Sequence, residues 1–189
     1  MPTVVFDFDK TLTKKDTVLG FLLFATNKNF ISLRLLALIF FAVLHKLKLI
    51  NNDLLKQKGI NLFLKDISEE TIKLRAKEYA SGIGLNDVYR TVFCTQYPTA
   101  IIATASFEDY VKPLCKDSLV LGAKLKYTNG KVSGLEQNAY GIQKTALLQE
   151  HGIKQIDIFY TDSFSDQPLM DIATEVYLVE NDRIKKIKG

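Results

Sequence analysis

The sequence has few of the residues that staple small proteins together or bind structural metals. It contains two cysteines, two histidines, four prolines and no tryptophan in 189 residues. Two cysteines, Cys94 and Cys115, do not make a disulfide framework and are typical of a reducing compartment. The absence of a Cys-x-x-Cys pair or a Cys/His cluster argues against a structural zinc site. Four prolines and ten glycines are also too few for a fibrous or linker-like chain.

Neither sign of charge is in large excess. The net charge of +4 is mild, so it does not indicate a nucleic-acid partner, and we expect none. Hydrophobic residues at 47% and charged residues at 24% exclude global disorder. Met1-Pro2 is followed at once by a strand-like run, without the basic segment or cleavage site of a secretory signal. We therefore expect a cytoplasmic protein, either free or associated with a membrane surface.

Apolar strands that alternate with helices predict an α/β protein with a parallel sheet. Asn129-Gly130 is a strong hairpin signal between residues 124–127 and 131–134. The predicted helices after the first hundred residues cover 107–115, 143–151 and 168–174. The predicted strands cover 3–8, 99–104, 118–121, 157–160 and 175–179.

A long helical stretch interrupts this pattern after the first strand. Residues 16–79 read as helical throughout, with N-cap signals at Asn51 and Ser68. We therefore divide the chain into a core domain of residues 1–13 plus 91–189 and a helical insert of residues 14–90. The insert is basic, with 13 Lys+Arg against 7 Asp+Glu, whereas the remainder has 12 against 14.

Two aspartates follow the first predicted strand. Asp7 and Asp9 stand two apart in Asp-Phe-Asp-Lys-Thr, and side chains two apart on a strand share one face. Carboxylates this close repel each other unless a proton or a cation intervenes. A Mg²⁺ ion with oxygen ligands fits this arrangement. A polar strand end that opens a turn would give the same short motif.

Three further signals are typical of a phosphate site. Thr104 closes a predicted strand and is followed by Ala105, so a hydroxyl and backbone N–H groups meet at a strand-to-helix junction. Lys144 opens a predicted helix and would offset negative charge on a phosphoryl group. Asp162 and Asp166 follow another predicted strand and would complete a Mg²⁺ site. Each signal alone is also explained by a turn, a helix cap or a solvated charge.

The order of these signals carries more information than any one of them. Asp-x-Asp-x-Thr, a strand ending in Thr, a Lys and Asp-Ser-x-x-Asp follow one another along the chain. With them the sequence resembles the haloacid dehalogenase-like (HAD) superfamily of Mg²⁺-dependent phosphatases over essentially its whole length. The resemblance implies a Rossmann-like HAD core with an inserted helical cap. Thr161 replaces the usual Gly before the fourth motif, which removes no ligand.

The resemblance also implies a role for each residue. The chain would hydrolyse phosphate monoesters through a phosphoaspartate on Asp7. Asp9, which phosphatases have and dehalogenases lack, would protonate the leaving oxygen and then activate water. The substrate phosphate would be bound by Thr104, Ala105 and Lys144.

The resemblance implies Mg²⁺ as the cofactor, held by Asp7, Asp9 through its carbonyl, Asp162 and Asp166. In this set Asp166 would bind the metal, orient water beside it or position Lys144. The presence of all these residues argues against another class of function, that of a non-catalytic module that docks on a membrane or on a partner. A response-regulator receiver domain is set aside because it lacks a helical insert after its first strand.

A helical cap after the first motif resembles the subgroup of phosphoserine phosphatase and the bacterial phosphatidylglycerophosphate phosphatases. In phosphoserine phosphatase an acidic cap residue binds the substrate amine and a Gly-Gly pair follows the second motif. Here residues 14–21 are followed by no Glu, and Ala-Ser-Phe replaces the glycines at 105–107. The sequence patterns of three segments resemble instead the members of the subgroup that act on lipid phosphates: residues 104–113, 129–134 and 140–144. We therefore expect a lipid phosphate such as phosphatidylglycerophosphate, with a small soluble ester of the phosphoserine kind as the alternative.

Residues 30–50 form the longest apolar stretch, and Leu35–Leu44 contains no polar residue. Its apolar side chains go right round the helix, so one buried face does not explain them. It is too short to span a bilayer, which takes about 20 apolar residues. Burial within the cap and a homodimer interface both explain the stretch. Peripheral contact with anionic lipid also explains it, because the flanks are basic: Lys28, Arg34, Lys46, Lys48, Lys56 and Lys58.

Overall fold

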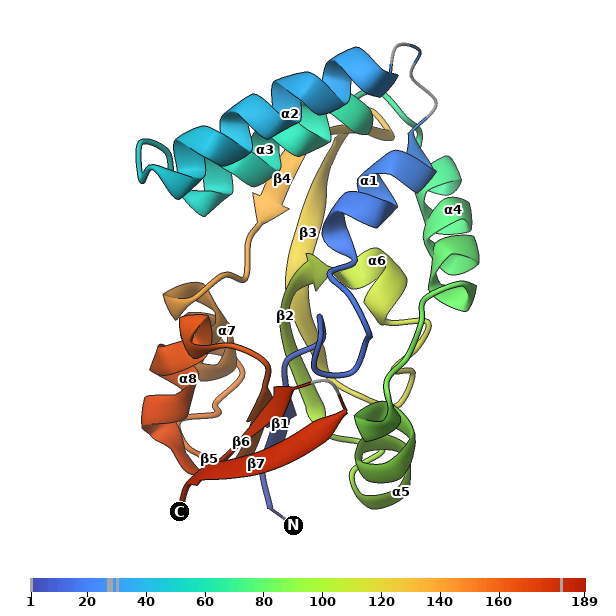
Figure 1. Cartoon of the computed structure of the whole chain (residues 1–189). Coiled ribbons are helices and arrows are strands. Elements are labelled where there is room, and N and C mark those ends of the chain that lie inside the picture. Colours follow the sequence, from blue (N-terminus) through green and yellow to red (C-terminus); the bar gives the residue numbers. More distant parts are fainter. Residues whose placement is uncertain (1, 27–28, 30, 181) are drawn as a thin grey trace.

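The computed structural model describes residues 2–26, 29, 31–180 and 182–189. A seven-stranded sheet in the order β4-β3-β2-β1-β5-β6-β7 forms its centre (Figure 1). The five middle strands run parallel, and the outer pairs β3/β4 and β6/β7 are antiparallel. This confirms the predicted α/β class. The strands are β1 (Val4–Phe6), β2 (Ile101–Phe107), β3 (Val120–Thr128), β4 (Lys131–Gln137), β5 (Ile156–Thr161), β6 (Ala173–Glu180) and β7 (Arg183–Lys188).

Both faces of the sheet are covered, which explains why β1 is apolar throughout. Phe6 belongs to a core shared with the helical insert, and its neighbour Val5 belongs to a second core beneath the other helices. Adjacent strand residues point to opposite faces, so each must be apolar when both faces are buried. The second core is formed with α7 (Ile142–Glu150) and α8 (Gln167–Ile172).

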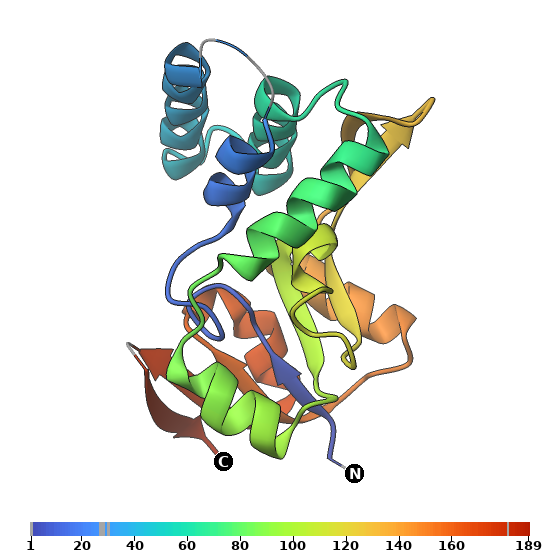
Figure 2. The same cartoon turned by 90° about the vertical axis from the view of Figure 1, so that its right-hand side faces the viewer.

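The helical insert lies between β1 and β2, as predicted, and forms a cap over one end of the sheet (Figures 1 and 2). Asn51 accepts a hydrogen bond from the Leu54 N–H, and Ser68 accepts one from the Thr71 N–H, so both predicted N-caps are confirmed. Within the described ranges, no helix combines the length and apolar character needed to cross a membrane. The cap helices are α1 (Val18–Ala25), α2 (Ile31–Lys46), α3 (Asn52–Phe63) and α4 (Glu69–Ser81).

The β3–β4 hairpin reaches out of the core and holds the cap. Its turn contains Asn129 and Gly130, both at positive φ, as the predicted hairpin requires. The Asp66 N–H donates to the Val132 carbonyl at 2.9 Å. The Leu135 N–H donates to Gln57 Oε1 of α3 at 2.8 Å. These bonds fix α3 to the core hairpin.

Several elements differ in length from the prediction: β1 covers only part of the predicted strand 3–8, and β2 covers 101–107 in place of 99–104. Strand β3 joins the predicted strand 118–121 to the predicted hairpin arm 124–127 across Gly122. A Cβ at Gly122 would lie 2.7 Å from the Ser106 carbonyl oxygen, so this glycine permits close strand contact instead of ending the strand. The predicted helix 107–115 shrinks to α6 (Glu108–Val111), because β2 runs to residue 107 and Pro113 has no N–H to continue the helix.

Further elements were not predicted. The edge strand β7 has the sequence RIKKIK, in which the isoleucines are three apart and every residue is exposed, so no alternating pattern marks it. A π-helical turn over Tyr89–Phe93 leads into the short helix α5 (Cys94–Gln96) before β2.

Candidate active site

Acidic side chains follow two neighbouring strands beneath the cap. Asp7 comes directly after β1 and Asp162 directly after β5, and these strands pair in parallel with Phe6 opposite Tyr160. The Asp7 N–H donates to the Tyr160 carbonyl at 2.9 Å. The carboxyl ends of neighbouring parallel strands meet at one edge, where α/β sheets bind their ligands.

A buried lysine joins two of the aspartates. Lys144 Nζ donates to Asp7 Oδ1 and to Asp166 Oδ2, each at 2.8 Å. The Thr161 hydroxyl donates to the same Asp166 oxygen at 3.0 Å. The Lys144 side chain is only 4% exposed, and both carboxylates are buried with it. Asp7 and Lys144, which are 137 positions apart in the sequence, thus belong to one buried charged cluster.

The charges of this cluster do not balance. Burial lowers the pKa of Lys144, but Asp7 and Asp166 outweigh this effect and hold it above its ordinary value. Burial raises the pKa of Asp7; Lys144 opposes this, and Asp166 and Asp9 add to it. One lysine therefore serves several carboxylates in a buried site, and a further cation would lower the pKa of Asp7.

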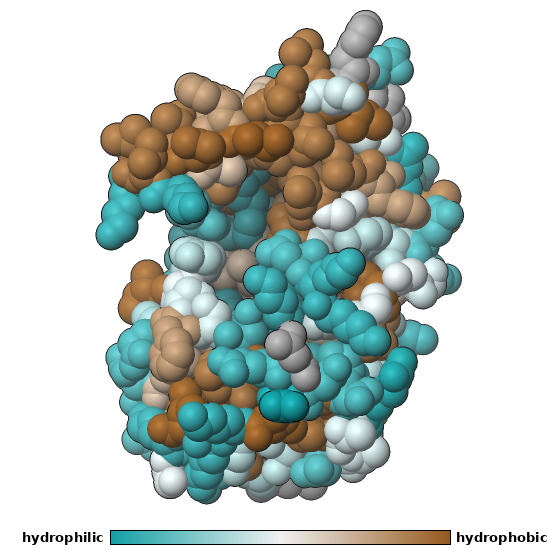
Figure 3. Space-filling view, viewed as in Figure 1, coloured by the Kyte–Doolittle hydropathy of each residue, from teal (hydrophilic) through white to brown (hydrophobic). Residues whose placement is uncertain are grey.

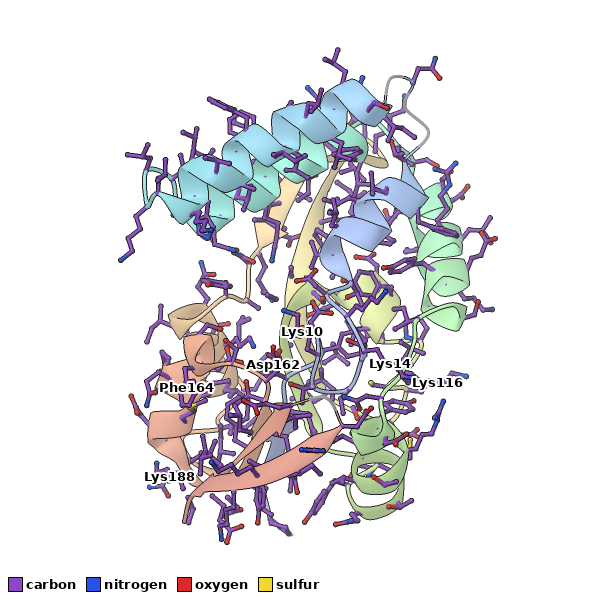
Figure 4. All side chains as sticks on the ribbon, viewed as in Figure 1. Lys10, Lys14, Lys116, Asp162, Phe164 and Lys188 are labelled. Atoms are coloured by element: carbon purple, nitrogen blue, oxygen red, sulfur yellow. The ribbon has the colours of Figure 1, made fainter. Side chains whose placement is uncertain are left out.

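Asp162 lies beside this cluster, close to Lys10 (Figure 4). Burial raises its pKa, while Lys10 and Lys144 lower it and Asp166 raises it further. In the part of the chain that the structure describes, no three acidic, histidine or cysteine side chains are grouped closely enough to hold a metal. A cation bound here would need backbone or water oxygens as well as carboxylates.

Asp9 is held by hydroxyl groups from the cap entrance and from β2. Its Oδ1 accepts from Thr17 Oγ1 at 2.6 Å and from the Thr17 N–H at 3.1 Å. Its Oδ2 accepts from Ser106 Oγ at 2.7 Å. Burial raises the pKa of Asp9 to about 6, Asp16 adds to this, and these hydrogen bonds oppose it. A carboxyl group with a pKa near neutrality can both give and take a proton.

Thr104 and Ala105 lie within β2 and not at its end, because the strand runs on to Phe107 with a register shift after Ala103. Thr104 is buried, and its Oγ1 accepts from the Ser106 N–H at 3.0 Å. The Ala105 carbonyl accepts from Lys56 Nζ at 2.6 Å.

Lys56 brings a charged group from the cap into the site. Its Nζ also donates to Asn138 Oδ1, and the Asn138 amide contacts Asp53 at the start of α3. Gln143, next to Lys144, donates to both oxygens of Asp53. Burial lowers the pKa of Lys56 to about 8, against the raising effects of Asp9 and Asp53. A polar network therefore ties α3 to the loop before α7.

A cavity of about 330 Å³ lies between this network and the cap. Its polar end is lined by Asp9, Asp16 and Lys56. Figure 3 shows a hollow beneath the apolar band that covers α2. The apolar wall comes from the cap helices, with side chains that include Leu22, Leu35, Leu38, Ile39 and Ala42.

The structure thus places Asp7, Lys144 and Asp166 in direct contact and Asp162 beside them. It places Asp9 next to β2, which carries Thr104 and Ala105. Thr17, Ser106 and Lys56 were not identified from the sequence. The sequence does contain a sign that Lys56 is buried. It lies at helical spacing from Gly59, Ile60 and Phe63, which form the buried face of α3.

Comparisons with known proteins identify the family and the fold. Residues 4–171 match the model of the family described as haloacid dehalogenase-like hydrolase. No curated protein matches the sequence significantly.

Several solved structures share the fold. A protein of unknown function from Bordetella pertussis Tohama I is 16% identical, with a TM-score of 0.73 over 92% of this chain and 87% of that one. A phosphoserine phosphohydrolase-like protein from Francisella tularensis is 18% identical, with a TM-score of 0.65 over 93% and 86%. A substrate-bound phosphoserine phosphatase is 15% identical, with a TM-score of 0.59 over 93% and 84%.

At these identities the structural matches establish the fold alone. The family model is stronger, because it covers most of the chain, including Asp7, Asp9, Thr104, Lys144, Asp162 and Asp166. The fold, the inserted cap and the family match agree: this chain belongs to the haloacid dehalogenase-like hydrolases, a family of enzymes.

Proposed function

We propose that the chain hydrolyses phosphate monoesters through a phosphoaspartate on Asp7. The observation that carries this proposal is the placement of two carboxyl groups in contrasting surroundings. Burial raises the pKa of Asp7 to about 8 in spite of its charged partner Lys144, so the ionised nucleophile would also need the cation that this site fits. Asp9 has a pKa of about 6, which suits proton transfer.

In the first step an Asp7 oxygen forms a bond to phosphorus, and the bond from phosphorus to the ester oxygen breaks. Asp9 gives its proton to the departing oxygen, which leaves as an alcohol. In the second step Asp9 takes a proton from water, whose oxygen attacks phosphorus and displaces the Asp7 carboxylate as phosphate forms. Lys144, with Thr104 and Ala105, stabilises the phosphoryl oxygens.

The residues present fit Mg²⁺ as the cofactor. The site supplies hard oxygen donors, and its carboxylates outnumber the buried lysine. Asp7, the carbonyl of Asp9 and Asp162 would hold the ion, and Asp166 would bind it, orient its water or position Lys144. When bound, Mg²⁺ offsets the negative charge shared by the phosphate and the carboxylates.

A small soluble ester of the phosphoserine kind is the substrate class that the structural neighbours support, since two of the matches above carry that name. The polar end of the cavity supports it too, because it offers an acid, Asp16, and a base, Lys56. These would face the amine and carboxylate of a zwitterion. Asp16 thereby provides the acidic group after the first motif that the sequence comparison did not find.

A lipid phosphate such as phosphatidylglycerophosphate is the second candidate, and one observation favours it. Leu35, Leu38 and Ile39 of α2 line the same cavity as Asp9. An apolar wall next to the acid group would suit an ester whose leaving group carries a hydrocarbon chain.

The test is phosphate release from two pools, phosphatidylglycerophosphate in mixed micelles and a panel of soluble esters that includes phosphoserine. Each pool is measured with Mg²⁺, with a chelator and with the Asp7→Asn variant as the blank. Release that needs both Mg²⁺ and Asp7 is the expected result, and the preferred pool identifies the substrate class. No release from either pool with Mg²⁺ present would contradict the proposal.

A further inference from the structure

The helix α2 carries an apolar surface that its own cap leaves uncovered. None of its sixteen residues is buried. Figure 3 shows this surface as a continuous brown band over α2. At 3.6 residues per turn the exposed positions span roughly half of the helix circumference. The exposed large apolar side chains of α2 and of the turn after it are Ile31, Leu33, Leu36, Ile39, Phe40, Val43, Leu47 and Leu49.

Charge around this surface is of one sign. From residue 31 to residue 63 the chain has five basic residues and one acidic residue. The acid, Asp53, and one of the basic residues, Lys56, are both hydrogen-bonded in the polar network below. The basic residues that remain are Arg34, Lys46, Lys48 and Lys58. Lys46 and Lys48 flank the exposed Leu47 at the end of α2, so basic groups lie at the border of the apolar surface.

The surface is continuous with the mouth of the cavity. Ile39 is half exposed and also lines the cavity that contains Asp9. Ala42, one turn further along α2, is likewise exposed and lines the same cavity. A membrane or protein that covers α2 would therefore lie next to the opening of the cavity that contains Asp9.

We propose that this surface docks on an anionic lipid bilayer, with α2 lying in the interface. An apolar helix face bordered by lysines is the composition that binds such an interface. A second copy of the chain fits less well, because pairing two α2 helices would bring basic groups together without acids to neutralise them. A coiled-coil seam would also need only a narrow stripe, whereas this surface is wide.

Docking would place the cavity mouth at the membrane surface. Only the use of that mouth by a substrate rests on the proposed function. The docking itself depends on α2 and not on the catalytic residues. It is therefore measured with the inactive Asp7→Asn variant, so that failure of docking and failure of catalysis are separate results.

The experiment is sedimentation with vesicles of phosphatidylcholine alone or of phosphatidylcholine mixed with phosphatidylglycerol. Leu36→Glu is compared with Leu74→Glu, because both leucines lie on helices and are 63% and 68% exposed. We expect Asp7→Asn and Asp7→Asn/Leu74→Glu to bind the mixed vesicles. Asp7→Asn/Leu36→Glu should bind at least about tenfold less, since binding strength follows the buried apolar area.

Either of two results would overturn the proposal. One is equal binding of the Leu36→Glu and Leu74→Glu proteins to anionic vesicles. The other is no binding of either protein; a dimer in light scattering that Leu36→Glu dissociates would then assign the surface to a second copy. Thermal unfolding of each variant verifies that the comparison uses folded protein.

Discussion

The charged cluster at the core end of the molecule and the α2 surface at its cap end are built by opposite rules. At the core end Asp7, Lys144 and Asp166 are buried, and each charged group contacts another at 2.8 Å. At the cap end α2 presents apolar side chains that are exposed, with no acidic residue among its sixteen. A buried charge is stable only when it is partnered, whereas an exposed apolar face gains free energy only when something covers it. Under the proposed function the core end would determine the chemistry, and the cap end would determine what reaches it.

The network around Lys56 connects the two ends. It joins the cap helix α3 to Ala105 of β2 and, through Asn138 and Asp53, to Gln143 of α7. The charged residues that line the cavity are Asp9, Asp16 and Lys56, so under the proposed function a substrate that enters along the apolar wall would meet charge at the inner end of the cavity.

The largest expected effect comes from removing the nucleophile. Asp7→Asn keeps the size of the side chain but loses the carboxylate that attacks phosphorus, so phosphate release should fall at least about 10⁴-fold. Asp171→Asn, an exposed aspartate on α8, is the matched control and should keep full activity. Mass spectrometry of acid-quenched enzyme and substrate should show a phosphorylated protein only when Asp7 is present. A phosphoprotein from Asp7→Asn would place the nucleophile elsewhere.

The next effect tests the role of Asp9. Asp9→Asn should slow hydrolysis of an alkyl phosphate by about 10²- to 10³-fold, which is the usual contribution of general acid–base catalysis. Aryl phosphates should lose much less in the phosphorylation step, because phenolates leave without a proton. Burst kinetics with an aryl ester measures this step separately from the water attack, which also needs Asp9. Equal losses of phosphorylation rate for both leaving groups would show that Asp9 is not the acid.

The residues that sequence reasoning identified are those that follow regular patterns. Asp7 and Asp162 each come directly after an apolar strand, and parallel strands bring such ends together without further information. The helical insert was predicted because Asn51 and Ser68 are local capping signals. Such features depend on neighbours in the sequence, so the sequence is sufficient to find them.

The residues that were missed depend on contacts between distant segments. Thr17 and Ser106 are 89 positions apart, and only the packing of α1 against β2 makes them common partners of Asp9. Lys56 read as one of several basic residues flanking an apolar helix, yet it is buried against Ala105. Strand β7 pairs with β6 through its backbone, with exposed side chains that give no burial pattern.

A smaller effect concerns binding at the inner end of the cavity. Lys56→Met should raise the KM of an ester that carries a carboxylate by about 10- to 100-fold, because a hydrogen bond to a charged group contributes about 1.5–3 kcal/mol. An ester without a carboxylate should show little change in KM. A similar increase for both esters would mean that Lys56 only supports the cap.

The pH dependence sharpens this test. Because burial lowers the pKa of Lys56 to about 8, its charge is lost as the pH rises through about 8, and the KM of the carboxylate ester should rise there. Lys56→Arg stays charged and should remove this rise. Folding stability follows the opposite sign: the unfolded lysine holds its proton up to its ordinary value of 10.5, so the Lys56 contribution to stability increases between about pH 8 and 10.5. A KM that is independent of pH in the wild type would contradict the assignment.

The smallest effect compares the rigidity of the two regions through one type of substitution. Gly122→Ala places a Cβ 2.7 Å from the Ser106 carbonyl oxygen, a backbone atom that cannot move alone. Gly59→Ala in the cap places a Cβ 3.0 Å from Leu22 Cδ1, the end of a flexible side chain. We expect Gly122→Ala to lower the free energy of unfolding by about 1–3 kcal/mol and to reduce activity, because Ser106 holds Asp9.

Gly59→Ala should stay within about 1 kcal/mol of the wild type, because the gain in helix propensity offsets the shift of Leu22. Urea unfolding followed by circular dichroism, with phosphate release measured on the same samples, checks both variants. If the core end is the rigid part, only the β3 substitution changes catalysis at saturating substrate. Equal losses of stability in the two variants would mean that the cap is packed as tightly as the core, and α2 would then be a fixed wall of the cavity.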